Sequence, residues 1–291
     1  MLSIRTNMAS VNAQRNMNVA TSSLQANFAK LSSGYRITKA SDDAAGMGVS
    51  TNLRSQITSY KMAMRNAQDA VSVIQTTEAA LNESAAIITR LRELTVQAAS
   101  DGLGSVERQY LSKEVSELTS ELDRIANTTE FNGRKLISSE TSLQFQVGIR
   151  NTSSDNINIT IADATLGGLG LSGATTGTDA AFAKKFSSLA ETAGTAAATG
   201  YQKLLTKLDT ALDSISNRRA TLGATANRLQ SAQNTLAIAM ESAQQANSRV
   251  RDVDVAAESS SMSANQVLVQ AGVSMLAQAN QAPQAALKLL G

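Results

Sequence analysis

The chain has 291 residues with 26 basic and 24 acidic side chains, one proline, and no cysteine or histidine. The missing cysteines exclude disulfides and thiolate chemistry, and the missing histidines exclude triad hydrolases and histidine-bearing zinc sites. We therefore expect neither an enzyme nor a bound metal or cofactor, and the nearly balanced charge gives no support to nucleic-acid binding. With few aromatic residues and no proline before Pro283, the composition favours long helices packed through aliphatic side chains.

The first segment, residues 4–33, is typical of an amphipathic helix with few charges. Its apolar face carries Met17, Ala20, Leu24, Phe28 and Leu31. The opening fourteen residues have no basic start followed by an apolar core, so they do not resemble a secretory signal peptide. No apolar run reaches the length of a membrane span. We therefore expect no membrane insertion and, if the protein leaves the cell, an export route that needs no such peptide.

A heptad repeat predicts a long helix over residues 44–99. We expect it to end near Asp101–Gly104, where a glycine can close the helix in a left-handed conformation. Asp42 and Asp43 precede it, and adjacent carboxylates suit either a metal ion or a helix cap. We favour the cap, because carboxylates accept hydrogen bonds from the free N–H groups of a first turn. The seam consists of residues that alternate four and three apart: Leu53, Ile57, Tyr60, Met64, Ala67, Val71, Ile74, Leu81, Ala85 and Ile88.

Two further helices repeat this spacing. One begins at Ser105, a suitable N-cap, and stops at the turn Phe131-Asn132-Gly133. Charged residues interrupt the seams at Glu78, Arg92 and Arg219, where they either extend into water at the bundle edges or fix the register through ion pairs; we favour the edges. The apolar positions are Leu111, Val115, Leu118, Leu122 and Ile125 in one helix, and Leu208, Leu212, Ile215, Leu222, Ala226, Leu229, Leu236, Met240 and Ala243 in the other.

The middle of the chain has a different pattern. Residues 143–147 and 156–161 alternate polar and apolar side chains, which predicts a small β-hairpin. The stretch 164–200 is rich in glycine, threonine and alanine, so we expect mostly loop. The expected fold is mainly α: an elongated antiparallel helical bundle or coiled coil with a small β-hairpin region, in which both termini are helical and paired.

The last segment, residues 255–290, is a second amphipathic helix with a broad apolar face. Its apolar residues include Val269, Val273 and Leu276. A lone amphipathic helix is marginal in water. The two terminal helices therefore either pair with each other in the monomer or stay partly disordered until neighbouring subunits bury them, and we favour the second alternative.

Several blocks resemble the signatures of bacterial flagellins. Near the N-terminus they are Leu31–Ile37 (LSSGYRI), Ala40–Gly46 (ASDDAAG) and Arg90–Gln97 (RLRELTVQ). The C-terminal blocks are Arg219–Ala224 (RATLGA), Asn227–Leu229 (NRL) and Gln278–Gln284 (QANQAPQ). Because they occur in order over nearly the whole chain, the chain is identified as a flagellin-like filament protein of short form, without the bulky outer domains of larger relatives.

The resemblance implies a division into domains. Residues 1–42 with 252–291 would form the terminal inner layer of a filament, and residues 43–163 with 201–251 a helical rod with the hairpin near 143–161. Residues 164–200 would be a short variable surface segment. The function implied is a structural subunit that is exported unfolded through the flagellar type III apparatus and self-assembles extracellularly into the filament used for swimming. Apolar residues expected to drive assembly are Met17, Leu24, Phe28, Leu31, Val269, Val273 and Leu276.

The resemblance also implies partners. Besides copies of itself in a helical homopolymer, we expect a flagellar export chaperone on the C-terminal helix, the filament cap and the hook–filament junction proteins. In many flagellins a vertebrate Toll-like receptor binds an epitope whose residues match Arg90, Leu94 and Glu114 of this chain. The alternative is that these residues belong to an ordinary solvent-exposed helix face.

The main alternative function is a hook–filament junction protein with flagellin-like ends. A secreted coiled-coil adhesin or effector has no reason to carry both signature ends. A metalloprotease inserted in the middle would need an HExxH motif, which a chain without histidine does not contain.

Overall fold

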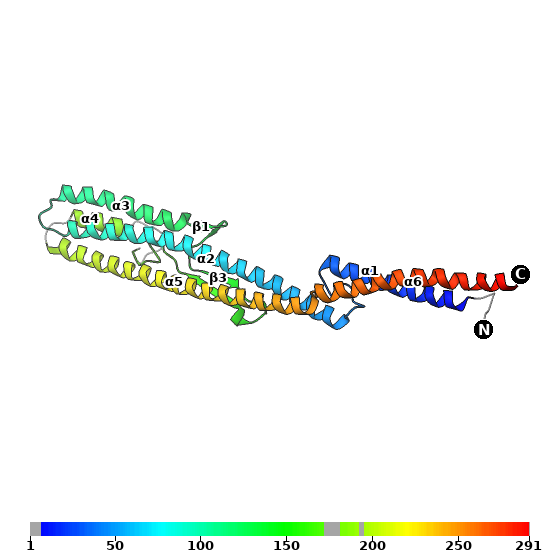
Figure 1. The fold of residues 1–291 in the computed structure, drawn as a ribbon. Helices are drawn as coiled ribbons and strands as arrows, with labels where there is room; N and C mark the ends of the chain where they lie inside the picture. The colour runs from blue at the N-terminus through cyan, green and yellow to red at the C-terminus, as the bar shows by residue number, and fades with distance from the viewer. Residues whose placement is uncertain (1–6, 172–180, 192–194, 291) are drawn as a thin grey trace. The chain divides into compact units, whose positions relative to one another are not determined.

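The computed structural model describes residues 7–171, 181–191 and 195–290, and its regular elements are mainly helices (Figure 1). The chain forms two compact units, each built from segments distant in sequence. One unit combines the chain up to Thr58 with the chain from Met240 onward, and the other is Ser59–Ala239. The expectation of a mainly helical fold with a β-hairpin and paired helical termini is confirmed. Of the two alternatives for the terminal helices, the structure shows pairing within one chain and not the partial disorder that the sequence analysis favoured.

The first unit contains the two terminal helices, α1 (Met8–Ser33) and α6 (Val255–Leu290), which lie antiparallel to each other (Figure 1). Helix α1 starts where the Asn7 side chain accepts a hydrogen bond from the Ser10 N–H (3.1 Å), as an N-cap does. It ends at Gly34, whose φ of 73° allows its N–H to donate to the Lys30 carbonyl (2.9 Å).

The short connection that follows α1 and the short connection that precedes α6 are joined to each other by main-chain hydrogen bonds. The Arg36 N–H donates to the Arg251 carbonyl (2.7 Å), and the Val253 N–H donates to the Gly34 carbonyl (3.0 Å). The Arg251 guanidinium also stacks 4.3 Å from the centre of the Tyr35 ring. We call this pairing of residues 34–36 with residues 250–253 the clasp. The clasp joins the C-terminal end of α1 to the N-terminal end of α6.

Helix α2 (Ala44–Ala98) directly follows Asp42 and Asp43, the two adjacent carboxylates noted in the sequence. Asp43 Oδ1 accepts from the Gly46 N–H (2.8 Å), so Asp43 caps the helix as predicted. Asp42 instead holds the preceding turn, because its Oδ2 accepts from the Thr38 and Lys39 N–H groups (3.0 and 2.9 Å). The Lys39 and Thr38 hydrogen bonds lower the pKa of Asp42.

The second unit is built on the predicted seams of α2, α3 (Ser105–Thr128) and α5 (Thr195–Arg251); α2 and α5 each have residues in both units. Arg92 Nε meets Asp209 Oδ1 at 2.7 Å, and Arg219 lies 3.8 Å from Glu78, so α2 and α5 are side by side. The side chains of Glu78, Arg92 and Arg219 are partly exposed, as the edge interpretation expects. All three also form ion pairs between the two helices. Fully buried seam residues include Ala67, Ile74, Leu81, Ile88, Val115, Leu122, Leu208, Ile215 and Leu229.

The junction between α2 and α3 differs from the expectation. Neither Gly102 nor Gly104 has a positive φ; within the described ranges, such glycines are Gly34, Gly133 and Gly170. Instead, Arg108 from the first turns of α3 donates to the Ser100 carbonyl (3.0 Å) just past the end of α2. Gly104, not Ser105, is the N-cap of α3 and makes no side-chain cap. The buried Arg108 side chain thus donates to a main-chain carbonyl just past the end of α2, as the N–H of the left-handed Gly34 does at the end of α1.

Two small antiparallel hairpins complete the second unit. The first pairs β1 (Glu130–Phe131) with β2 (Arg134–Lys135) across Asn132 and Gly133, both with positive φ (50° and 74°). The second pairs β3 (Thr141–Gln146) with β4 (Asn156–Ile161), placing Leu143 opposite Ile159. This is the hairpin predicted from alternation, and the inward side chains of β4 are buried.

Much of the stretch expected to be loop is packed structure. Leu166, Leu169 and Leu171 are buried, and α4 (Ala181–Ala190) packs on α3. Phe186 of α4 meets Tyr201 of α5 edge to face, with ring centroids 5.1 Å apart. Aromatic side chains within an alanine-rich segment therefore anchor a helix that composition alone did not suggest. Residues 172–180 and 192–194 lie outside the described residues, and the predicted domain division remains a prediction.

Candidate assembly surfaces

The α1–α6 pair meets along a seam of heptads on both helices. Half-buried or buried positions follow a four-three spacing along each helix. Five of the seven residues predicted for assembly lie in this intramolecular seam and are partly buried: Met17, Leu24, Leu31, Val269 and Leu276. The structure therefore uses them first to hold the two terminal helices together.

The other two predicted assembly residues point away from the seam. Phe28 is 54% exposed and Val273 is 57% exposed. They belong to larger apolar faces that the sequence reading captured only in part, because it followed a single stripe on each helix. Each large apolar side chain concerned is at least 47% exposed: Met8, Val11, Val19 and Phe28 on α1, and Val255, Val267, Leu268, Val273 and Met275 on α6.

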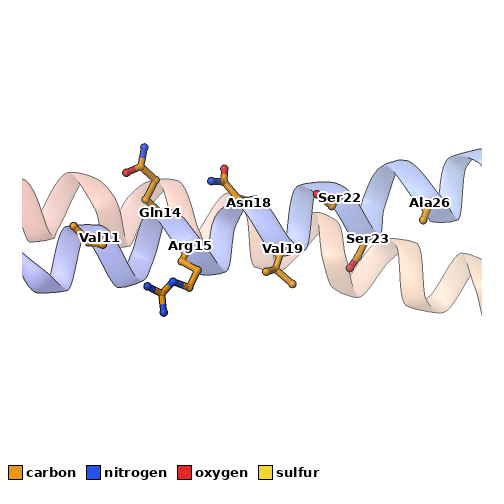
Figure 2. A pocket seen from close by; sticks show the side chains of 8 residues that line it. All are labelled: Val11, Gln14, Arg15, Asn18, Val19, Ser22, Ser23 and Ala26. Atoms are coloured by element: carbon orange, nitrogen blue, oxygen red, sulfur yellow. The ribbon is translucent and has the colours of Figure 1, made fainter.

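A shallow groove of about 690 Å³ follows the outer side of α1. Figure 2 shows Gln14 and Asn18 projecting from one side of the helix, and Arg15 and Val19 from the other. Small residues, among them Ser22 and Ala26, continue the groove along the helix. A surface of small and apolar residues along an exposed helix suits close packing of another helix.

The second unit holds the three residues matched to a receptor epitope. Arg90 donates from Nε to Glu114 Oε1 and from Nη1 to Glu93 Oε2, both at 2.9 Å. Arg90 and Glu114 are well exposed, with side-chain exposures of 49% and 42%, so they form one surface feature on α2 and α3. Leu94 is only 1% exposed and belongs to the core. The structure thus brings Arg90 and Glu114 together at the surface and places Leu94 beneath it.

Arg218 has a structural role that the sequence analysis did not predict. Arg218 of α5 donates from Nη1 to the Asp163 carbonyl and from Nη2 to the Gly168 carbonyl, the latter at 3.1 Å. Burial lowers its pKa. It holds the turn after β4 in place. No local pattern indicated this role, because its partners are main-chain oxygens about fifty residues away.

Neither a metal-binding cluster nor a membrane span is found in the part of the chain that the structure describes. Among the residues described, no three acidic side chains gather as a metal site would require. Over the same residues, no helix combines the length and the apolarity needed to cross a bilayer.

Comparison with known proteins decides the family. A family model described as the bacterial flagellin N-terminal helical region matches residues 4–142, and one described as the C-terminal helical region matches residues 205–290. Flagellin of Bacillus subtilis (strain 168) is 40% identical, over 99% of this chain and 99% of its own length. The flagellar filament 30.7 kDa core protein of Treponema maltophilum is also 40% identical, with 99% of each chain covered. The chain belongs to the bacterial flagellin family.

Flagellins are structural proteins of the flagellar filament, so this flagellin chain is a filament subunit of the short form. The hook–filament junction alternative is not favoured, because relatives that span the whole chain are named as flagellins or filament core proteins. A putative flagellar hook-associated protein from Vibrio parahaemolyticus shares the fold, with a TM-score of 0.60 at 12% identity over 72% of this chain and all of its own. The crystal structure of Bacillus cereus flagellin is 30% identical, covers 59% of this chain and 88% of its own, and has a TM-score of 0.44.

Proposed function

We propose that this flagellin self-assembles into a helical homopolymer through the outer faces of α1 and α6. The observation that carries the proposal is the set of large apolar side chains left exposed on both helices after they have paired with each other. Val267 and Met275, for example, are 68% and 62% exposed. The pairing of α1 with α6 leaves these side chains in contact with solvent. Their burial by neighbouring subunits would be favourable, because burial of apolar surface contributes about 25 cal/mol per Å².

The proposal includes the route and the place of assembly. The subunit is exported unfolded through the flagellar type III apparatus, joins the extracellular filament and serves swimming motility. An export chaperone covers the C-terminal helix in the cytoplasm, since its exposed apolar face would otherwise associate prematurely. The filament cap and the hook–filament junction proteins are the other assembly partners. Deletion of residues 252–291 should abolish chaperone capture in a pull-down, and capture that survives the deletion would contradict this part.

A Toll-like receptor is a further proposed partner. The exposed Arg90–Glu114 pair supports it as a charged surface feature. Leu94 would act from beneath, by holding α2 in place, because its side chain is buried. Arg90→Ala should lower receptor signalling by soluble monomer without unfolding the chain, and an unchanged response would remove the receptor from the list of partners.

Seeded polymerisation of purified chain, followed by electron microscopy, tests the main proposal. The variant replaces Val267 and Val273 by threonine, which keeps the shape of each side chain and exchanges a methyl for a hydroxyl. The control places the same exchange at Val96 and Val106, which are 49% and 52% exposed in the other unit. If α6 is buried on assembly, each exchange costs about 1–3 kcal/mol there.

The expected result is filament elongation at least tenfold slower for the α6 variant than for the control, with far-UV circular dichroism of both monomers unchanged. Elongation of the α6 variant at the wild-type rate would refute assembly through this face. Failure of the intact chain itself to elongate filament seeds would refute the proposed function as a whole.

A further inference from the structure

The hairpin of β1 and β2 turns at Asn132-Gly133, the one Asn-Gly pair in the sequence. Both residues have a positive φ (50° and 74°), and within the described ranges Asn132 is the only non-glycine residue with this property. Because these two residues alone connect the paired strands, the φ values are those of a type I′ turn. Such a turn favours Asn followed by Gly, so its shape accounts for the pair.

The same pair is chemically reactive when the chain is open. After a base has removed its proton, the main-chain nitrogen of Gly133 attacks the side-chain amide carbon of Asn132. A C–N bond forms, ammonia leaves, and a cyclic imide results. Water then opens the imide at either of its carbonyls, which gives aspartate or isoaspartate, and no oxidant or cofactor takes part. Glycine permits the attack because it has no Cβ to shield its nitrogen.

The folded turn keeps the two reacting groups apart. Ring closure requires the Gly133 nitrogen to lie on the same side of the Asn132 Cα–C bond as the Asn132 Cβ. At the first central position of a type I′ turn ψ is about 30°, which places that nitrogen nearly opposite the Cβ. The antiparallel pairing of β1 with β2 on either side of the turn holds this conformation. The imide therefore forms only after the hairpin has opened.

The hairpin also directs the chain into the core of the second unit. Thr129, which ends α3, accepts a hydrogen bond across the hairpin from the Leu136 N–H (3.1 Å). Leu136 and Ile137 follow β2 and are 1% and 0% exposed. In isoaspartate the main chain runs through the side-chain carbons, so the turn gains a methylene and the strands lose the pairing of a two-residue turn. The aspartate product keeps an ordinary main chain, and Asp-Gly suits the same turn.

We propose that Asn132 is a site of spontaneous deamidation which the folded hairpin suppresses, and that its isoaspartate product impairs refolding of the second unit. The rate in the folded chain equals the rate in the open chain multiplied by the fraction of time for which the hairpin is open. A chain kept unfolded thus loses the ability to fold with time, whereas a folded chain is protected. The inference concerns the second unit alone and rests on no part of the function proposed above.

Peptide mapping of the full-length chain tests the suppression. The chain is incubated at mildly alkaline pH, either folded or unfolded in guanidinium chloride, and samples taken over time are digested with trypsin. Cleavage after Arg124 and Arg134 releases a peptide in which conversion of Asn132 changes the mass from that of an amide to that of an acid. Asn127 in the same peptide is the internal reference, because the β-branched Thr128 that follows it hinders the attack.

Conversion of Asn132 should be at least tenfold slower in the folded chain than in the unfolded chain, while Asn127 stays intact in both. Phe131→Ala should accelerate conversion in the folded chain at least threefold, because Phe131 packs against the core and anchors β1, and it should leave the unfolded rate unchanged. Phe145→Ala is the matched control, since Phe145 is also partly buried against the core but lies in the other hairpin.

Three outcomes of this experiment would overturn the proposal. The first is an equal rate of conversion in the folded and unfolded chains, and the second is an unfolded chain that keeps the Asn132 amide. The third is an equal acceleration by Phe131→Ala and Phe145→Ala, because the protection would then not lie in the hairpin of β1 and β2.

Refolding tests the consequence of the modification. Chain aged in guanidinium chloride is diluted into buffer, and a brief pulse of trypsin digests the molecules whose second unit has not folded. Isoaspartate, which chromatography separates from aspartate in the same peptide, should be enriched at least fivefold in the digested fraction. Asn132→Asp is the control, because it adds the same charge to a chain of ordinary length and should refold with the yield of the unmodified protein. Isoaspartate in equal proportion in both fractions would overturn this part of the proposal.

Discussion

Leu94→Ala should destabilise the second unit strongly, even though Leu94 matches a surface epitope in sequence. The side chain is 1% exposed and belongs to the same apolar cluster as Leu91 and Leu122. Replacing a buried leucine by alanine removes its transfer free energy and leaves a cavity, which together cost about 3–5 kcal/mol. Arg90→Ala breaks ion pairs that are about half exposed, and solvent screening leaves such pairs with little effect on stability.

Chemical denaturation followed by near-UV circular dichroism measures this difference, because Tyr60, Tyr110 and Tyr201 lie in the second unit. Val96→Ala is the control on the same helix: with 49% exposure, it should change the free energy of unfolding by about 0.5 kcal/mol or less. A Leu94→Ala value within 1 kcal/mol of the control would show that this part of α2 is not packed as described. The expected value would mean that receptor assays on Leu94→Ala report folding as well as contact.

Two further predictions concern polar side chains of α5, the half-buried Arg218 and the buried Tyr201. Arg218→Ala leaves the Asp163 and Gly168 carbonyls without their charged donor, so amide hydrogen exchange over residues 163–171 should accelerate at least tenfold; Arg228→Ala, an exposed change on the same helix, should leave it unaltered. Burial raises the pKa of Tyr201 above its ordinary value of 10.0, so the unfolded chain loses this proton first and stability should fall as pH rises above 10, until the folded pKa is reached. Tyr201→Phe should flatten this part of the profile, and equal slopes for the two proteins would contradict the assignment.

The long helices could be predicted because their information is local and repeated. The spacing of Ile74, Leu81 and Ile88 specifies a buried stripe whatever its partner is, and the structure buries all three. The hairpin of β3 and β4 was similarly accessible, since alternation indicates a half-buried strand and a polar stretch indicates the turn.

Features that depend on distant partners could not be predicted. Arg108 closing the end of α2, and Arg218 holding the turn after β4, both use main-chain carbonyls, which leave no pattern in the sequence. Leu94 shows the converse limit: a motif match identified the residue but not the side of the helix on which it lies. For the assembly surface, heptad spacing identified the seam, whereas the outer faces became visible only once that seam was known to be filled.

The clasp has a consequence for how this region tolerates genetic change. Because the Gly34–Val253 and Arg36–Arg251 contacts are made by main-chain atoms, most side chains at Arg36, Arg251 and Val253 leave the bonds available, whereas the positive φ of Gly34 favours glycine there. An insertion or deletion of one residue, in contrast, displaces every donor from its acceptor and rotates the helix that follows by about 100°. Variation in length rather than in identity is therefore what these two short connections cannot accommodate, and alignments of relatives should show them free of gaps.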